Sequence, residues 1–299
     1  MILPVRSFVL KVLIPVFILM LPGALYGQGP ARINMGFYFP SINDIADRTD
    51  IEISLTFWTK ELTEEVAVTE SHAFLYDTVQ TMRKAFDEGE IDMIIAPPLV
   101  IAKYFDRTML ADGFVGVREE GLNNSLLLLV NKDRIDTLKD LRGKRIILPV
   151  NDELAEVFLD TLTLKTFKKS FKNIFSVAQP KIKNNRIVLD LFFDKADAAI
   201  VYQGAFDVMA ELNPQILTKL KILASYPVRA KNFSYFHKDY PLRELLTQKA
   251  MSYGEFPRAK QILAVYKTPV LDYCKVEELE MFDTLYAEYL ELKKQVKGN

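Results

Sequence analysis

The chain has very few of the residues on which metal sites and nucleophilic enzymes depend. Cys274 is the only cysteine among 299 residues, which excludes a disulfide within the chain and a metal cluster held by several cysteines. The two histidines, His72 and His237, are far apart in sequence, and neither stands in a motif that would place a base beside a nucleophile. We therefore predict no catalytic residue, no metal site and no cofactor, and a chain that is not an enzyme.

The chain also lacks a net charge strong enough to attract a polyelectrolyte. Its 38 basic and 39 acidic residues leave a formal charge of -1, so no overall field favours nucleic acid or an anionic membrane. One segment, residues 165–186, departs from this balance with seven basic side chains and no acid. Phe167, Phe171 and Phe175 recur there at helical spacing. We interpret them as core residues below a solvated lysine face, with contact to nucleic acid or anionic lipid as the alternative.

The N-terminal apolar run, residues 12–21, falls short of the roughly 20 residues that a membrane span needs. Arg6 and Lys11 precede it, and small or polar residues follow. This order is typical of a secretory signal peptide, for which we predict cleavage near Gly27. No cysteine stands directly after the run, which excludes a lipoprotein. We expect an exported, periplasmic protein; an uncleaved anchor is the alternative.

Two stretches about a hundred residues apart share one pattern. In the first, Asp92 precedes an apolar run too short for a helix, which reads as a buried strand and stops at Pro97. Pro98 then suits the first turn of a helix. In the second, Asp197 precedes a small apolar strand that ends near Tyr202 and gives way to another helix. Two such corners predict two α/β lobes, and open α/β sheets bind ligands at the carboxyl ends of their strands.

The remaining apolar runs complete these two lobes. We expect strands over residues 33–39, 73–76, 110–117, 125–130, 146–150, 217–225 and 233–236. We expect helices over residues 79–86, 137–145, 154–164 and 186–193, and through 242–294 with a break at 271–273. The expected division is a signal peptide at 1–27, a discontinuous lobe 1 at 28–118 plus 226–299, and lobe 2 at 119–225.

Several motifs resemble one family of transport receptors. They are Gly89-Glu90-Ile91-Asp92, Leu138-Lys139-Asp140-Leu141-Arg142-Gly143-Lys144-Arg145-Ile146, the corner at 194–204, Leu212-Asn213-Pro214, Ile262-Leu263 and Leu271-Asp272-Tyr273. Together they resemble the type-2 periplasmic solute-binding proteins, in the phosphate/phosphite/phosphonate-binding branch. The resemblance covers essentially everything after the signal segment. It implies an α/β fold of two hinged lobes, each a mixed, mostly parallel sheet flanked by helices.

The resemblance also implies a function and partners. Members close two lobes around a small molecule and hand it to an ABC-type permease, so we expect a small-molecule ligand, a membrane permease, no nucleic acid and a monomer. The alternative is a sensory or interaction module of the same fold that acts with a membrane-bound signalling protein.

The candidate cleft departs from the family at one turn. Phosphonate-type binders hold their anion there with a turn rich in serine and threonine, whereas this chain has Asn151-Asp152-Glu153. Carboxylates at a helix N-terminus satisfy the helix dipole themselves and repel an oxyanion. The predicted ligand-binding residues lie at or near strand ends: Phe37, Tyr38, Phe74, Tyr76, Pro97, Asn151, Asp152, Tyr202 and Gln203. Aromatic rings and acids together suit an organic cation or an amphipathic solute, although these rings could instead pack the lobes.

Overall fold

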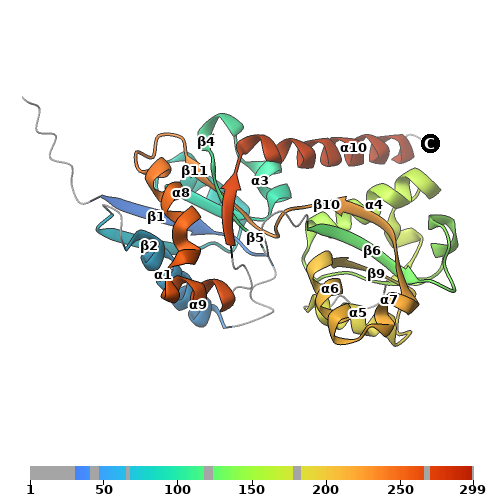
Figure 1. The fold of residues 1–299 in the computed structure, drawn as a ribbon. Coiled ribbons are helices and arrows are strands. Elements are labelled where there is room, and N and C mark those ends of the chain that lie inside the picture. Colours follow the sequence, from blue (N-terminus) through green and yellow to red (C-terminus); the bar gives the residue numbers. More distant parts are fainter. Residues whose placement is uncertain are drawn as a thin grey trace, which may run out of the picture.

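The computed structural model describes residues 31–40, 47–64, 68–117, 124–177, 183–265 and 270–297. Within these ranges the chain forms two α/β lobes that lie side by side, each around one five-stranded sheet (Figure 1). Among the helices described, none is long and apolar enough to cross a membrane. The predicted signal peptide, its cleavage near Gly27 and the alternative anchor lie outside the described residues.

Lobe 1 is built on a mixed sheet with the strand order β2-β1-β3-β11-β4. Its strands are β1 (Arg32–Phe37), β2 (Glu70–Leu75), β3 (Met93–Ala96), β4 (Leu110–Ala111) and β11 (Phe233–His237). β1 pairs in parallel with β2 and β3, and β11 pairs antiparallel to β3 and β4. The helices of this lobe are α1 (Arg48–Thr63), α2 (Val79–Asp87), α3 (Pro98–Tyr104), α8 (Arg243–Ser252) and α9 (Pro257–Val265).

Lobe 2 is built on a second mixed sheet with the strand order β10-β6-β9-β7-β8. Its strands are β6 (Ser125–Asn131), β7 (Arg145–Ile147), β8 (Ser176–Val177), β9 (Ala198–Tyr202) and β10 (Leu220–Pro227). β9 and β8 pair in parallel with β7, while β6 is antiparallel to both β9 and β10. The helices are α4 (Glu153–Phe167), α5 (Asn184–Phe192), α6 (Gln203–Leu212) and α7 (Gln215–Lys219).

A further helix joins the two lobes. It is α10 (Glu280–Lys297), which follows a two-stranded sheet of β5 (Gly113–Val117) and β12 (Val270–Cys274) and packs on both α3 and α4 (Figure 1). Phe282 is fully buried there between Phe233 of lobe 1 and Tyr226 of lobe 2. One apolar core therefore continues from lobe 1 through α10 into lobe 2.

The two corners foreseen in the sequence share one hydrogen-bond pattern. We call residues 92–98 the first corner and residues 197–203 the second corner. In the first, the Asp92 amide donates to the Asn34 carbonyl, and the Asn34 amide donates to the Asp92 carboxylate at 2.8 Å. In the second, the Asp197 amide donates to the Arg145 carbonyl, and the Arg145 amide donates to the Asp197 carboxylate at 2.9 Å. Each aspartate thus anchors its strand to a parallel neighbour.

Local patterns in the sequence predicted several elements correctly. Val79, Met82, Ala85 and Phe86 all face the core from α2, as their spacing indicates. Pro98 occupies the first turn of α3, and the expected helix at 154–164 is α4. The exact lobe boundaries proposed from the sequence stay predictions.

The structure adds detail to three stretches of the prediction. Residues 110–117 are extended as predicted, but they form two strands, β4 and β5, in different sheets. β5 begins at Gly113, where the Cβ of any other residue would lie 2.3 Å from the Ser234 carbonyl oxygen. The expected break in the helices at 271–273 is confirmed, and it is the strand β12, which pairs with β5. The helical spacing of the phenylalanines in residues 165–186 extends beyond one helix, since α4 ends at Phe167 and Lys168 adopts a left-handed φ of 56°. Phe171 and Phe175 are nevertheless buried, as predicted.

Candidate ligand-binding site

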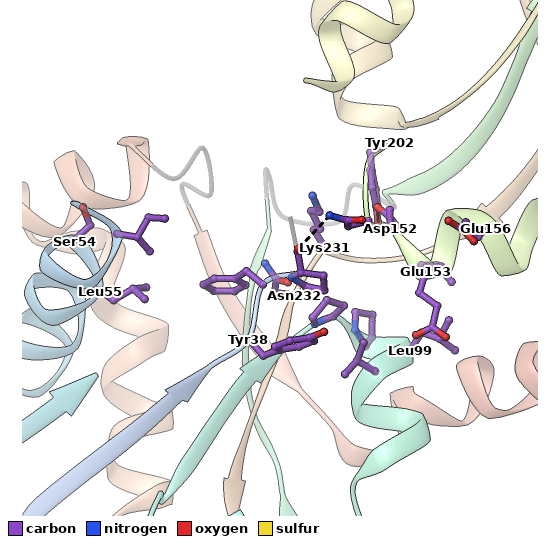
Figure 2. A pocket seen from close by; sticks show the side chains of 18 of the residues that line it. Tyr38, Ser54, Leu55, Leu99, Asp152, Glu153, Glu156, Tyr202, Lys231 and Asn232 are labelled. Carbon is purple, nitrogen blue, oxygen red and sulfur yellow. Dashed lines mark hydrogen bonds between the residues drawn. The ribbon is translucent and has the colours of Figure 1, made fainter. Parts of the chain in front are cut away.

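A cavity of about 590 Å³ lies between the two lobes, at the carboxyl ends of β1, β3 and β9. Figure 2 shows Tyr38 of lobe 1 and Tyr202 of lobe 2 on opposite sides of it, with Lys231 of the segment that connects the lobes between them. The lining consists of Tyr38, Phe39, Pro40, Asp50, Ile51, Ser54, Leu55, Pro97, Pro98, Leu99, Val100, Asn151, Asp152, Glu153, Leu154, Glu156, Tyr202, Lys231 and Asn232. The site is therefore shared by both lobes and by the connection between them.

The wall that α3 contributes is short of hydrogen-bond donors. Pro97 and Pro98 form the start of this helix and have no amide hydrogen. The amides of Val100 and Ile101 both donate to the Pro97 carbonyl, at 3.0 and 3.1 Å. Leu99 and Val100 are buried. This wall is apolar and leaves little with which to bind an anion.

The wall that α4 contributes is acidic, and Asp152 organises it. One oxygen of this carboxylate caps α4 by accepting a hydrogen bond from the Ala155 amide at 3.1 Å. The other accepts from the Tyr202 hydroxyl at 2.9 Å. Burial, and secondarily the Asp152 charge, raise the pKa of Tyr202 well above its ordinary value, so the phenol keeps its proton and directs it at Asp152. Asn151, just before the cap, adopts a left-handed φ of 50°.

An ion pair connects the lobes beside the cavity. Lys103 of α3 donates to the Glu153 carboxylate at the first position of α4. The Lys103 ammonium also lies 4.9 Å from the ring centre of Tyr104 and 4.8 Å from that of Tyr286 in α10. Burial alone would lower the pKa of Lys103, but its bond to Glu153 raises it above the ordinary value. Lys103 therefore stays charged and neutralises Glu153.

The structure brings together five of the nine residues predicted for the site. These are Tyr38, Pro97, Asn151, Asp152 and Tyr202.

The four others lie outside the cavity lining. Phe37 is the last residue of β1 and points into the core, where its ring packs edge-on against Trp58 at 5.9 Å. Phe74 is 42% exposed on the edge strand β2. Tyr76 follows that strand and packs against the core, and Gln203 begins α6. A strand end places alternate residues on opposite faces, so being near one does not put a side chain in the cleft.

Three charged lining residues were not foreseen. Glu156 lies one helical turn after Asp152, and this spacing could have revealed it from the sequence. Lys231 belongs to the connection between β10 and β11, which passes the cleft. Asp50 lies in the first turn of α1, and no local pattern connects it to the site.

The two sheets, with a cavity between them at their strand ends, define a two-lobe α/β binding protein of the type-2 periplasmic class. Residues 47–269 match a family described as ABC transporter, phosphonate, periplasmic substrate-binding protein. The chain belongs to this family, whose members bind a substrate and are not enzymes.

Solved structures share the fold at low sequence identity. A protein from Xanthomonas citri bound to ATP has a TM-score of 0.62 and 13% identity, with 88% of this chain and 98% of that chain covered. The binding component of an ABC phosphonate transporter from Pseudomonas aeruginosa has a TM-score of 0.58 and 14% identity, covering 90% of this chain and 89% of that one. PhnD1 from Prochlorococcus marinus with methylphosphonate has a TM-score of 0.58 and 14% identity, covering 89% and 100%. No curated protein matches the chain in sequence.

Proposed function

We propose that the protein is an exported receptor that closes its two lobes around a small molecule and delivers it to an ABC-type permease. The observation that carries this proposal is the cavity of about 590 Å³, to which both lobes and their connection contribute residues. A volume of this size suits a small ligand. A molecule that contacts both walls stabilises the closed arrangement, because only that arrangement offers both sets of contacts.

The connection between β10 and β11 is anchored on both sides of the cleft. On the lobe 2 side, the Tyr226 hydroxyl donates to the Met281 carbonyl at 2.8 Å. On the lobe 1 side, the Arg229 guanidinium donates to the Glu278 carboxylate at 2.8 and 2.9 Å. Lys231, two residues after Arg229, lines the cavity. We propose that closure rotates the two lobes about α10 and this connection. A ligand bound at Lys231 therefore contacts the segment about which the lobes rotate.

Native mass spectrometry with small-angle X-ray scattering tests the receptor role. We expect the purified protein to carry a small molecule of defined mass, and the radius of gyration to increase when that molecule is removed. Tyr38→Ala, which removes an aromatic wall of the cavity, should lower the occupied fraction. Tyr273→Ala is the matched control, because Tyr273 is 51% exposed on β12 and is not part of the cavity lining.

A protein without bound molecule, or equal occupancy in both variants, would contradict the receptor role. Membrane partners separate the two candidate roles: co-purification with a permease and its ATPase supports delivery, and co-purification with a histidine kinase supports the sensory alternative. If the protein is exported and cleaved near Gly27, N-terminal sequencing of the periplasmic protein should give a first residue near Gln28.

A further inference from the structure

We infer that the cleft binds an organic cation with an apolar body, such as an alkylammonium compound, and not the oxyanion that the family name suggests. This inference rests on the proposed receptor function and names the chemical class of its ligand. It follows from two features of the lining: several donors beside the cleft are absent or already engaged, and most of the charged lining residues are carboxylates.

Free amide hydrogens at a helix N-terminus form a ready site for an oxyanion. At α3, Pro97 and Pro98 supply no amide hydrogen. At α4, the Ala155 amide is bound to the Asp152 side chain and the Glu156 amide to the Asp152 carbonyl. The Tyr202 hydroxyl, which would otherwise point at a ligand, donates to the same carboxylate. Asp152 therefore occupies three of the donors nearest the cleft.

The first turn of α4 carries Asp152, Glu153 and Glu156, all of which line the cavity. Glu153 is neutralised by Lys103 of the other lobe. Glu156 is different, because its nearest ammonium, that of Lys172, is 3.9 Å away and both side chains are at least half exposed. An exposed pair of this kind is weak and easily exchanged. Glu156 can therefore turn its charge to a ligand.

The rest of the lining suits the body of such a cation. The Tyr38 ring lines the cavity and can bind an ammonium group over its face, since aromatic faces attract cations. Leu55 and Leu99 provide apolar surface beside it. Asp50, on α1, adds a further carboxylate from lobe 1. Lys231 is the one basic residue among those that line the cavity in the described part of the chain.

Calorimetric titration at low salt tests the charge preference directly. The probes are an alkyltrimethylammonium salt and methylphosphonate. We expect the ammonium probe to bind, Glu156→Gln to weaken it at least tenfold, and methylphosphonate to give no heat. Glu291→Gln is the control, because Glu291 is an exposed carboxylate on α10 outside the cavity lining. It should leave the affinity unchanged.

Asp152→Ser sharpens the test, because serine also caps helices well while it removes the charge. We expect this variant to bind the ammonium probe more weakly and methylphosphonate more strongly than the wild type does.

Binding of methylphosphonate by the wild type, no binding of any ammonium probe, or equal affinity in Glu156→Gln and Glu291→Gln would each overturn the cation assignment. The receptor role would survive those results if native mass spectrometry still found a bound molecule. Absence of that molecule would instead remove the proposed function itself.

Discussion

The first and second corners have the same backbone geometry but different chemistry. In each, an aspartate before a buried strand exchanges hydrogen bonds with the backbone of a parallel neighbour. The neighbour is Asn34 in the first corner and Arg145 in the second. The guanidinium of Arg145 adds two bonds to Asp197 at 3.1 Å, whereas the Asn34 side chain turns away and donates to the Glu90 carbonyl. One residue on the neighbouring strand therefore decides whether the corner contains an ion pair.

The pKa values of the two aspartates shift in opposite directions for this reason. Burial raises the pKa of Asp92, and the Asn34 amide with the charges of Arg32 and His237 offsets only part of the effect. Burial also acts on Asp197, but the hydrogen bonds and charge of Arg145 outweigh it and lower the pKa. The repeated sequence pattern thus gives the two corners the same backbone hydrogen bonds, while the pKa values of their aspartates differ.

The corners also end differently, and the largest expected effect tests that difference. The first ends at Pro97, whose side chain has no polar group to satisfy. The second ends at Tyr202, whose buried hydroxyl donates its hydrogen bond to Asp152. Asp152→Ala removes the cap of α4 and leaves the Tyr202 hydroxyl without its acceptor, so we expect a loss of about 2–3 kcal/mol in the free energy of unfolding. Urea denaturation measures it. Tyr202→Phe is the control and should cost less, because it leaves the cap in place. Equal losses would show that the cap contributes nothing, and an unchanged stability in Tyr202→Phe would show that the hydroxyl contact contributes nothing.

A smaller effect is expected at the ion pair of the second corner. Asp197→Asn keeps an acceptor for the Arg145 amide but removes the charge, so we expect a loss of about 1 kcal/mol at pH 7. Because the folded-state pKa of Asp197 is lowered, its contribution is present above the unfolded value, about 3.9, and is lost as the pH falls through the folded value. Urea denaturation from pH 7 to pH 3 should therefore show wild type and variant converging. A constant difference would rule out the ion pair as its source.

The sequence predicted those parts of the fold that local periodicity determines. The buried face of α2 follows from the spacing of Val79, Met82, Ala85 and Phe86 alone. The first corner was correct because the prolines end the strand whatever surrounds them. The strand at 110–117 was predicted, but its division between two sheets was not, since β4 pairs with β11 and β5 with β12, both far along the chain.

The candidate site was predicted less well than the fold, for two physical reasons. Moving one residue along a strand reverses the side-chain direction, which separates buried Phe37 from Tyr38 in the cavity. Contacts between residues far apart in sequence leave no periodic trace, as with Tyr202 and Asp152. The sequence predicted the acidic character of the first turn of α4, because Asp152 and Glu153 are adjacent in sequence. The contribution of Asp50 depends on how α1 faces the cleft, which no local pattern encodes.

The smallest expected effect concerns the first corner and has the opposite dependence on pH. Since the folded-state pKa of Asp92 is raised, its stabilising contribution is present below the unfolded value, about 3.9, and is lost as the pH rises. Asp92→Asn keeps an acceptor for the Asn34 amide and removes the buried charge. We expect it to gain stability relative to the wild type as the pH rises from 3 to 7, because the wild type must then keep a buried charge. The same urea series measures this difference beside that of Asp197→Asn. Slopes of the same sign would contradict the opposite pKa shifts of the two aspartates, and opposite slopes would confirm them.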